Sequence, residues 1–416
     1  MMALIRLARR RGFRSLVGPA LASRLESLDC IAPNAMQSRA LPLGLAGEDV
    51  LLSAQTGSGK TLCFLLPLLE RGLASAGSRS AASSSAAASS SSAPVAEPRA
   101  LVVVPTRELA SQVAGVASAL VDPSRAARAV GSVTGPAADP ALADAELLVC
   151  LPDALRARLR DGTLSTARLR AVAFDEADAL LCEPFGGLTP EASELLDALE
   201  ASTGPSAAPP QVLLTTATLS DAHAELLLDR FPAARRVSHT GELVPTLKSV
   251  FHYHRGADRD RELLRLLSRA ELDPWLAEGT TLVFTRSAAE ADRVCAVLAA
   301  ARPECSPAVL HGEADPGRRA EALRAFASAE CRLLVATDVA ARGLDFPRLR
   351  HVVMAGGHDP ADVSTYVHCA GRTARRGQRG RVSFLIHTGE DGSFRHQGHH
   401  ALRPAAKLEF VSRDES

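Results

Sequence analysis

The chain has 416 residues, of which 46% are hydrophobic and 23% are charged, so its composition is that of a globular protein with two or three domains. This composition excludes collagen, a coiled coil and disorder along the full length. The 47 cationic and 47 acidic residues balance, so any nucleic-acid surface must be a local concentration of arginine. No apolar run reaches the roughly 18 residues of a membrane span, so we expect a soluble protein.

The N-terminal segment is basic. Five arginines fall within the first 14 residues, and no acidic residue precedes Glu26. Such a start is typical of a transit peptide for a mitochondrion or a chloroplast. It is equally typical of a short lead-in to the first helix of a protein of the cytoplasm or nucleus. The eight cysteines form no C-x-x-C pair, so the sequence gives little support to a zinc site or a thioredoxin-like site. No secretory signal is evident, which favours reduced, intracellular thiols.

Short, continuous apolar runs alternate with helical patterns through the first half of the chain. Continuous runs suit parallel strands that are buried on both faces, and the alternation indicates a βαβ series. The expected strands are 50–52, 101–104, 147–149, 172–174 and 212–214. The expected helices between them include 108–120 and 191–199.

The same pattern repeats in the second half, which predicts a second α/β domain. The expected strands are 282–284, 308–310, 333–335 and 382–384, with helices at 288–300 and 318–326. Residues 75–98 are mostly Ser and Ala and cannot bury enough apolar surface to order, so they are interpreted as a flexible insertion. The expected organisation is a lead-in at 1–12, a first domain at 13–240, a linker at 241–250, a second domain at 251–392 and a polar tail at 393–416.

A phosphate-binding loop follows the first expected strand. The run Ala-Gln-Thr-Gly-Ser-Gly-Lys-Thr occupies residues 54–61, with alanine in place of the first glycine of the strict pattern. Its backbone N–H groups can cradle phosphates, Lys60 would reach the β and γ phosphates, and Thr61 would hold Mg²⁺. A turn that merely needs glycines is the alternative. The chain has only three lysines, so a lysine retained here favours the functional interpretation. The expected phosphate contacts are Thr56, Gly57, Ser58, Gly59, Lys60 and Thr61.

An acidic run follows the strand at 172–174. Asp-Glu-Ala-Asp occupies residues 175–178, at the end of a strand, where α/β sheets bind their ligands. Asp175 fits the carboxylate that holds Mg²⁺, and Glu176 fits the base for the attacking water. Alone, such a run would often be an acidic helix start. Combined with the phosphate loop, it indicates a nucleotide hydrolase.

With further blocks, these motifs resemble the DEAD-box family of ATP-dependent RNA helicases. The blocks are Pro-Thr-Arg-Glu-Leu-Ala at 105–110, Thr-Ala-Thr at 216–218, Thr-Asp-Val-Ala-Ala-Arg-Gly-Leu-Asp at 337–345 and His-Cys-Ala-Gly-Arg-Thr-Ala-Arg at 368–375. Gln37 occupies the position of the adenine-reading glutamine, and Phe13 lies near the usual upstream aromatic. The resemblance covers roughly residues 13–390. It implies an α/β fold of two tandem RecA-like domains, each a parallel sheet flanked by helices.

The resemblance also implies roles for individual residues. Gln37 would hydrogen-bond adenine in a bidentate manner, and Asp345 would meet the ribose. Arg372 and Arg375 would act as arginine fingers, because planar guanidinium groups suit the charge of the transition state. The implied RNA contacts are Arg107, Gly135 and Thr337, which would grip the backbone regardless of sequence. The residues implied to couple ATP hydrolysis to RNA binding are Asp178, Thr216, Thr218 and His368.

The sequence departs from the family pattern at several positions. Cys30 stands where an aromatic usually stacks on adenine, and Asn34 replaces a Ser or Thr. The usual Thr-Pro-Gly-Arg block reads Leu151, Pro152, Asp153 and Ala154, while Pro316 replaces a Gln and Cys369 replaces an Arg. The ATP-hydrolysing residues are therefore expected to be intact. The contacts with RNA and the contacts that couple the two domains are expected to be fewer.

Two functions follow from these expectations. The first is an ATP- and Mg²⁺-dependent, RNA-stimulated ATPase that unwinds short RNA duplexes or remodels RNA–protein complexes when its two domains close. The alternative is an ATP-gated RNA clamp or assembly scaffold with little unwinding. The terminal segments are short, so we expect a monomer whose RNA targets are selected by ribonucleoprotein partners.

Overall fold

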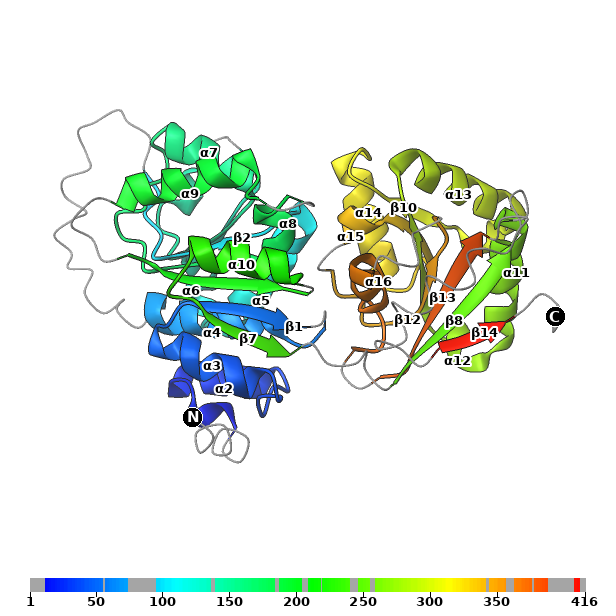
Figure 1. Ribbon diagram of the computed structural model, residues 1–416, viewed down its shortest axis with the longest axis horizontal. Coiled ribbons are helices and arrows are strands. Elements are labelled where there is room, and N and C mark those ends of the chain that lie inside the picture. Colours follow the sequence, from blue (N-terminus) through cyan, green and yellow to red (C-terminus); the bar gives the residue numbers. More distant parts are fainter. Residues whose placement is uncertain are drawn as a thin grey trace. The chain divides into compact units, whose positions relative to one another are not determined.

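A computed structural model describes residues 12–54, 57–73, 95–135, 139–183, 187–203, 209–217, 219–239, 246–254, 259–341, 344–356, 363–375, 378–387 and 408–411. The chain forms two compact units. The first comprises Met1–Ala54 and Gly59–His239, and the second comprises Thr240–Ser416 together with Gln55–Ser58. Each unit contains a seven-stranded sheet in which every pair of neighbouring strands is parallel, with helices packed on its faces (Figure 1).

The first unit has the strand order β3-β4-β2-β5-β6-β1-β7. Its strands are β1 (Val50–Ala54), β2 (Ala100–Val103), β3 (Val130–Val133), β4 (Leu147–Cys150), β5 (Ala171–Asp175), β6 (Gln211–Thr216) and β7 (Arg235–His239). Its helices are η1 (Phe13–Ser15), α2 (Pro19–Ser27), α3 (Gln37–Ala46), α4 (Lys60–Leu73), α5 (Arg107–Leu120), α6 (Pro123–Ala129), η3 (Pro140–Leu142), α7 (Pro152–Arg160), α8 (Ala177–Leu181), α9 (Pro190–Thr203) and α10 (Asp221–Arg230).

The alternation of side chains along each strand builds two apolar layers on the first sheet. Leu52 of β1 belongs to the apolar layer that contains Phe64 of α4, whereas its neighbour Leu51 belongs to the layer on the opposite face, which contains Leu155 of α7. Both faces are therefore covered. Burial on both faces is the reason that these strands read as continuous apolar runs in the sequence.

The second unit has the strand order β10-β11-β9-β12-β13-β8-β14. Its strands are β8 (Leu247–His254), β9 (Thr280–Thr285), β10 (Ala308–Leu310), β11 (Leu333–Thr337), β12 (Leu349–Met354), β13 (Gly380–His387) and β14 (Leu408–Val411). Its helices are α11 (Arg259–Leu272), α12 (Pro274–Ala277), α13 (Ala288–Ala301), η5 (Pro303–Cys305), α14 (Pro316–Ala327), α15 (Asp338–Ala341) and α16 (Val363–Ala370). Leu282 of β9 packs toward α14 and α16, and Val283 packs toward α11 and α13.

The expected α/β fold is confirmed, and a strand lies at each of the nine expected positions. Three expected boundaries differ from the structure. Strand β8 begins at Leu247, within the expected linker at 241–250. Strand β14 lies in the expected polar tail at 393–416, where its backbone pairs with the sheet edge at β8. Ala96, in the expected insertion at 75–98, is buried and forms a bridge with Leu164. Residues 74–94 lie outside the described residues.

In the portion of the chain that the structure describes, no helix is both long enough and apolar enough to cross a membrane.

Candidate active site

The parallel sheet of the first unit brings the candidate residues to one edge. Strands β5, β6 and β1 are neighbours, and their carboxyl ends carry Asp175, Thr216 and Ala54. Strands β3, β4 and β2 are also neighbours, and the chain leaves them at Gly135, Leu151 and Arg107. The expected nucleotide residues and the expected RNA residues of this unit therefore occupy adjoining halves of the same sheet edge, where open α/β sheets bind ligands.

The phosphate loop connects β1 to α4. Gly57 and Gly59 have φ angles of 80° and 84°, in the left-handed region that favours glycine. Lys60 is the first residue of α4 and is 7% exposed, and its Nζ donates to the carbonyl oxygen of Ala54, 2.6 Å away. A cation and the N-terminus of a fourteen-residue helix thus meet at the end of β1, an arrangement that attracts phosphate. Thr61 is half-buried beside them.

Gln37 is tied to the phosphate loop. Its Nε2 donates to the carbonyl oxygen of Gly59 at 3.1 Å, and a Cβ at Gly59 would lie 2.5 Å from that nitrogen. Asn34 forms a reciprocal pair with it: the Gln37 N–H donates to Asn34 Oδ1 at 2.9 Å, and the Asn34 N–H donates to Gln37 Oε1 at 3.0 Å. The amide keeps a second hydrogen and a second lone pair, which is what a bidentate contact with adenine requires.

Asn34 is the residue whose role sequence reasoning missed. It replaces the family's Ser or Thr, and its Oδ1 accepts from the N–H of Gln37, the first residue of α3, as a capping side chain does. The Asn-x-x-Gln spacing is the signal that could have shown it, because this is a capping-box pattern.

Asp175 and Glu176 are both buried at the end of β5. The Asp175 carboxylate accepts hydrogen bonds from Thr215 Oγ1 at 2.7 Å and from the Glu176 N–H at 3.1 Å. Burial and the neighbouring Glu176 carboxylate raise the pKa of Asp175 to about 6, and the charge of Lys60 opposes this rise. Thr215 was not predicted; it precedes the Thr-Ala-Thr block by one residue.

Glu176 has a φ angle of 55°, which is left-handed and costs a residue with a Cβ about 1–3 kcal/mol. It stands at the N-cap of α8 and is 2% exposed. The strained backbone directs the chain from β5 into α8 immediately after Asp175. Such strain at a buried acidic residue is typical of functional sites.

The residues at the ends of β1 and β5 fit a magnesium ion. Mg²⁺ takes oxygen ligands, and Asp175 and Thr61 offer a carboxylate and a hydroxyl. Burial and the Glu176 carboxylate raise the pKa of Asp175, and the charge of Lys60 offsets only part of this rise. A divalent cation would supply the missing positive charge. Among the described residues there is no group of three or more His, Cys, Asp or Glu side chains that could hold a metal by themselves.

The expected RNA residues of the first unit are accessible. Arg107 is exposed at the start of α5, whose N-cap Thr106 accepts from the Leu109 N–H at 3.2 Å. Gly135 follows β3, and a Cβ there would meet no atom within 4 Å. A backbone could therefore approach this glycine closely.

The altered block after β4 has structural roles of its own. Leu151 stands at the N-cap position of α7 without a side-chain cap bond, and Pro152 is the first residue of the helix, where the missing N–H costs nothing. Asp153 is exposed and forms an ion pair with Arg156 at 2.8 Å. Ala154 is 4% exposed and belongs to the apolar layer beneath the helix. The loss of an arginine at 154 thus goes with a position that faces the core.

In the second unit the structure brings two predicted residues together. Arg375 Nη1 forms an ion pair with Asp345 Oδ1 at 2.7 Å, and Arg375 Nε donates to the Gly371 carbonyl oxygen at 2.9 Å. Asp345 and Arg375 retain 27% and 12% of their side-chain exposure. The residue that is expected to meet the ribose is therefore bonded directly to one of the expected arginine fingers.

Arg372, the other expected arginine finger, is held within its own domain. It is 2% exposed, its Nε donates to the His368 carbonyl oxygen at 3.0 Å, and its Nη1 donates to the Leu344 carbonyl oxygen at 3.2 Å. An arginine finger needs accessible donors. In this conformation Arg372 instead ties α16 to the segment that leads to Asp345.

The other candidates of the second unit lie at the carboxyl end of β11 and in α16. Thr337 ends β11 and is half-buried, and His368 is 1% exposed. Cys369 is fully buried, with its Sγ 3.6 Å from Asp338 Oδ1. Pro316 is the first residue of α14, where Asp315 caps the helix.

The remaining candidates fall in or near loops. Thr216 is fully buried at the end of β6, and Asp178 lies in the first turn of α8. Ser58 is half-buried in the phosphate loop, and Cys30 is half-buried in the loop before Gln37. Thr56 and Thr218 lie outside the described residues.

Comparison with known proteins agrees with this arrangement. A model of the DEAD/DEAH box helicase family matches residues 34–226, and a model of the helicase conserved C-terminal domain matches residues 263–377. An ATP-dependent RNA helicase, dbp3 of Aspergillus clavatus, is 31% identical over 379 residues, which cover 88% of this chain and 70% of that protein.

Solved structures show the same fold. S. cerevisiae Dbp5 bound to RNA and ADP BeF3 has a TM-score of 0.76 and 21% identity, over 96% of this chain and 95% of that one. The DEAD-box helicase Mss116 bound to ssRNA and UDP-BeF has a TM-score of 0.78 and 21% identity, over 96% of this chain and 79% of that one.

Proposed function

The chain belongs to the DEAD-box family of ATP-dependent RNA helicases, and from this premise we propose that RNA-stimulated ATP hydrolysis drives local duplex unwinding or RNA–protein remodelling. The observation that carries the proposal is that Lys60 and the buried Asp175–Glu176 pair lie at the carboxyl ends of β1 and β5, the two strands that flank β6. Closure of the two RecA-like domains on ATP and single-stranded RNA would couple ATP hydrolysis to the unwinding or remodelling of RNA.

The first domain would bind and hydrolyse ATP. Lys60 would balance the charge of the β and γ phosphates, and the N–H groups at the start of α4 would bind their oxygens. Thr61 and Asp175 would hold Mg²⁺, which neutralises phosphate charge when bound. Glu176 would orient the attacking water and accept its proton. Gln37 would select adenine while it bonds to Gly59 of the phosphate loop.

The second domain would supply the arginine that senses the γ-phosphate. Arg375 is the better candidate of the two, because 12% of its side chain is exposed and it forms an ion pair with Asp345, the residue expected at the ribose. Exchange of that contact for the ribose and the phosphates would accompany closure. Arg372 would act as a positioning residue for the helix that carries Arg375.

RNA would be held through its backbone. Arg107, Gly135 and Thr337 would contact phosphates, so the grip would not depend on sequence. Two relatives of the same fold are described as bound to RNA or ssRNA, which supports this assignment. Ribonucleoprotein partners would then select the targets of a monomeric enzyme.

A single pair of measurements tests the proposal. ATP turnover is measured with and without single-stranded RNA, and displacement of a short RNA strand is measured in the same buffer. Stimulated turnover together with displacement is expected. Turnover that does not respond to RNA would contradict the proposal.

The alternative of an ATP-gated clamp is favoured by the block after β4. Asp153 adds a negative charge near the expected RNA half, and Ala154 is too short and too buried to reach RNA. A clamp would show RNA-stimulated turnover and a long-lived RNA complex, but little strand displacement.

For the compartment, we propose that the basic start addresses the chain to a mitochondrion or chloroplast, with the cytoplasm or nucleus as the alternative. Residues 1–11 lie outside the described residues. A fluorescent protein fused behind residues 1–12 and, separately, behind a variant whose arginines are glutamines distinguishes the two addresses.

A further inference from the structure

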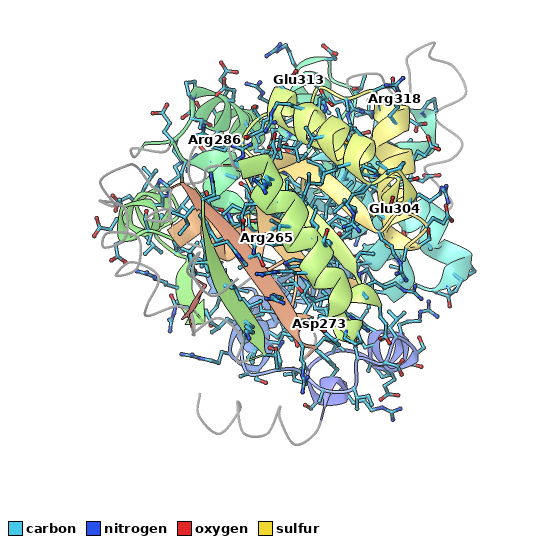
Figure 2. The ribbon with its side chains drawn as sticks, turned by 90° about the vertical axis from the view of Figure 1, so that its right-hand side faces the viewer. Arg265, Asp273, Arg286, Glu304, Glu313 and Arg318 are labelled. Carbon is cyan, nitrogen blue, oxygen red and sulfur yellow. The ribbon has the colours of Figure 1, made fainter. Side chains whose placement is uncertain are left out.

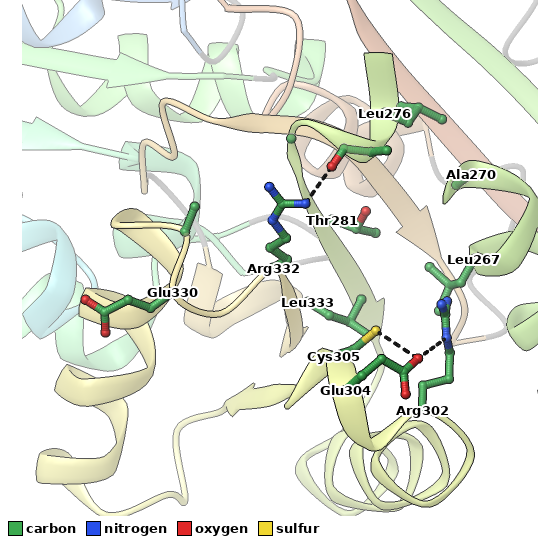
Figure 3. Close-up of a pocket in the computed structure, with 13 residues that line it drawn as sticks. Leu267, Ala270, Leu276, Thr281, Arg302, Glu304, Cys305, Glu330, Arg332 and Leu333 are labelled. Carbon is green, nitrogen blue, oxygen red and sulfur yellow. Dashed lines mark hydrogen bonds and ion pairs between the residues drawn. The ribbon is translucent and has the colours of Figure 1, made fainter. Parts of the chain in front are cut away.

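A cavity of about 310 Å³ lies in the second domain at the amino ends of its strands (Figure 3). Thr281 of β9 and Leu333 of β11 form its base, and Leu267 of α11 and Leu276 of α12 form an apolar wall. Its volume is at the lower limit for sites that bind small organic molecules. Strand β11 ends at Thr337, so the cavity lies at the opposite end of the strand from the candidate active site of this domain.

The charges around the cavity leave one cation in excess. Arg302 pairs with Glu304 at 3.4 Å. Glu330 also lines the cavity, and it pairs at 3.0 Å with Arg324, which does not belong to the lining. Figure 3 shows the Glu330 carboxylate turned away from the Arg302–Glu304 pair. Arg332 donates to the Ala277 carbonyl oxygen at 2.7 Å, and the described residues give it no carboxylate partner.

Two side chains at this cavity, Trp275 and Cys305, can report on the binding of a ligand. Trp275, the only tryptophan of the chain, adjoins the lining residue Leu276 and lies under Arg350, whose guanidinium carbon is 5.2 Å from the ring centroid. Cys305 lines the cavity and is half-buried. Binding can therefore be followed by tryptophan fluorescence and by the rate of thiol alkylation.

We propose that this cavity binds a small amphiphilic anion, a carboxylate or phosphate monoester with an apolar body. The apolar part would pack on Leu267, Leu276 and Leu333, and the anionic group would bond to Arg332, which has donors left beyond the one used on Ala277. The guanidinium of Arg302, 13% exposed at the same cavity, would add attraction. The hydroxyl of Thr281 offers a further donor at the base.

The proposal is independent of the ATPase. Every residue that carries it lies between Leu267 and Leu333, and none belongs to the ATP, RNA or coupling sets. Its failure would leave the proposed function untouched, and the reverse also holds.

The test uses the full chain and three probes. Trp275 fluorescence is titrated with 4-phenylbutyrate, with phenyl phosphate and with the neutral 4-phenylbutanol. The two anions are expected to bind at millimolar concentration or tighter, and the alcohol about tenfold more weakly. Bound anion should also slow alkylation of Cys305 by iodoacetamide, while the half-buried Cys30 of the first domain reacts at an unchanged rate. A preference between the two anions identifies which head group the site takes.

Arginine variants decide whether the charge matters. Arg332→Gln should weaken 4-phenylbutyrate binding about tenfold, as expected for the loss of one charged hydrogen bond. Arg332→Lys should retain most of it. The control is Arg318→Gln, at an exposed arginine of α14 outside the cavity (Figure 2). Equal binding of the anions and the alcohol, no binding at millimolar concentration, or equal effects of Arg332→Gln and Arg318→Gln would each overturn the proposal.

Discussion

Lys60 is a buried cation whose charge faces the end of β1, where its Nζ bonds to the carbonyl oxygen of Ala54. We expect Lys60→Ala to abolish ATP turnover and most nucleotide binding, because no other lysine lies in the described part of the first domain to replace it. The measurement is phosphate release together with nucleotide affinity. Lys248→Ala, in the second domain, serves as the control. Normal turnover in Lys60→Ala would contradict the phosphate-loop assignment.

Glu176 is the candidate base. We expect Glu176→Gln to bind ATP and RNA but to stall hydrolysis by about 100-fold or more, because the amide keeps the shape of the side chain and cannot accept the proton. Asp175 and its bonds to Thr215 remain. We expect the complex of this variant with RNA to be long-lived in the presence of ATP. The measurement is the rate of RNA release after competitor RNA is added. Release as fast as in the parent protein would exclude the base role.

The residue scale also shows what the sequence could and could not indicate. Lys60 and Asp175 were predicted because their chemistry is encoded in adjacent residues of the chain. The burial of Arg372 was not, because two arginines three apart have the same pattern whether they face solvent or the backbone of the domain. The capping role of Asn34 was read as a departure, because its residue type alone was compared.

At the scale of elements, most of the strands that sequence reasoning found are buried on both faces, although it also found the edge strand β10 and missed the central strand β12. Strand β7 (Arg-Arg-Val-Ser-His) is at the edge of its sheet, and it was missed because an edge strand carries polar side chains. Strand β8 was missed because its two histidines interrupt the apolar run, although both are buried. Polarity in the sequence does not separate a buried histidine from an exposed one.

Two buried histidines of the second domain, His252 and His351, predict that stability depends on pH. Burial lowers the pKa of His252 to about 4, and it lowers the pKa of His351, on β12, to about 3; the charge of Arg381 adds to both effects. The ordinary pKa is about 6.5, so the unfolded chain binds protons that the folded chain refuses. The stabilisation is complete above that value and is lost as the pH falls toward 4.

We therefore expect His351→Gln to reduce the dependence of the unfolding free energy on pH by about 1.4 kcal/mol per pH unit between about pH 6 and 4. The free energy is obtained from urea unfolding across this range. His223→Gln, at a half-buried histidine of α10, is the control substitution. An identical slope in the parent and in His351→Gln would show that this imidazole is not held neutral by the fold.

The Ser/Ala-rich insertion gives a second prediction at this scale. Deletion of residues 78–93 should leave the melting temperature and the ATPase intact, because a change in loop length costs only about 0.6 kcal/mol per doubling. The deletion keeps Ala96, whose backbone bridges Leu164. As a matched variant, deletion of residues 78–97 removes that bridge and should destabilise the first domain. A large loss of stability in the shorter deletion would show that the insertion packs on the domain.

At the scale of the whole molecule, each unit has the components of an independently folding domain. Each has its own seven-stranded sheet, and its apolar layers are composed only of its own residues. The candidate residues, however, are divided. Lys60, Asp175 and Glu176 belong to the first domain, whereas Asp345 and Arg375 belong to the second. Each domain should therefore fold without the other, whereas ATP turnover should require both.

We expect fragments 1–239 and 240–416 each to unfold cooperatively, because neither lacks a strand of its sheet. The first fragment should retain weak ATP binding through Gln37 and Lys60. It should show no RNA-stimulated turnover, because it lacks Arg375 and the RNA contact at Thr337. The intact chain measured in parallel is the positive control, and a mixture of the two fragments shows how much the covalent link contributes by raising the local concentration of one domain at the other. RNA-stimulated turnover by the first fragment alone, at the rate of the intact chain, would mean that the catalytic group is complete within one domain and that Arg375 has no part in it.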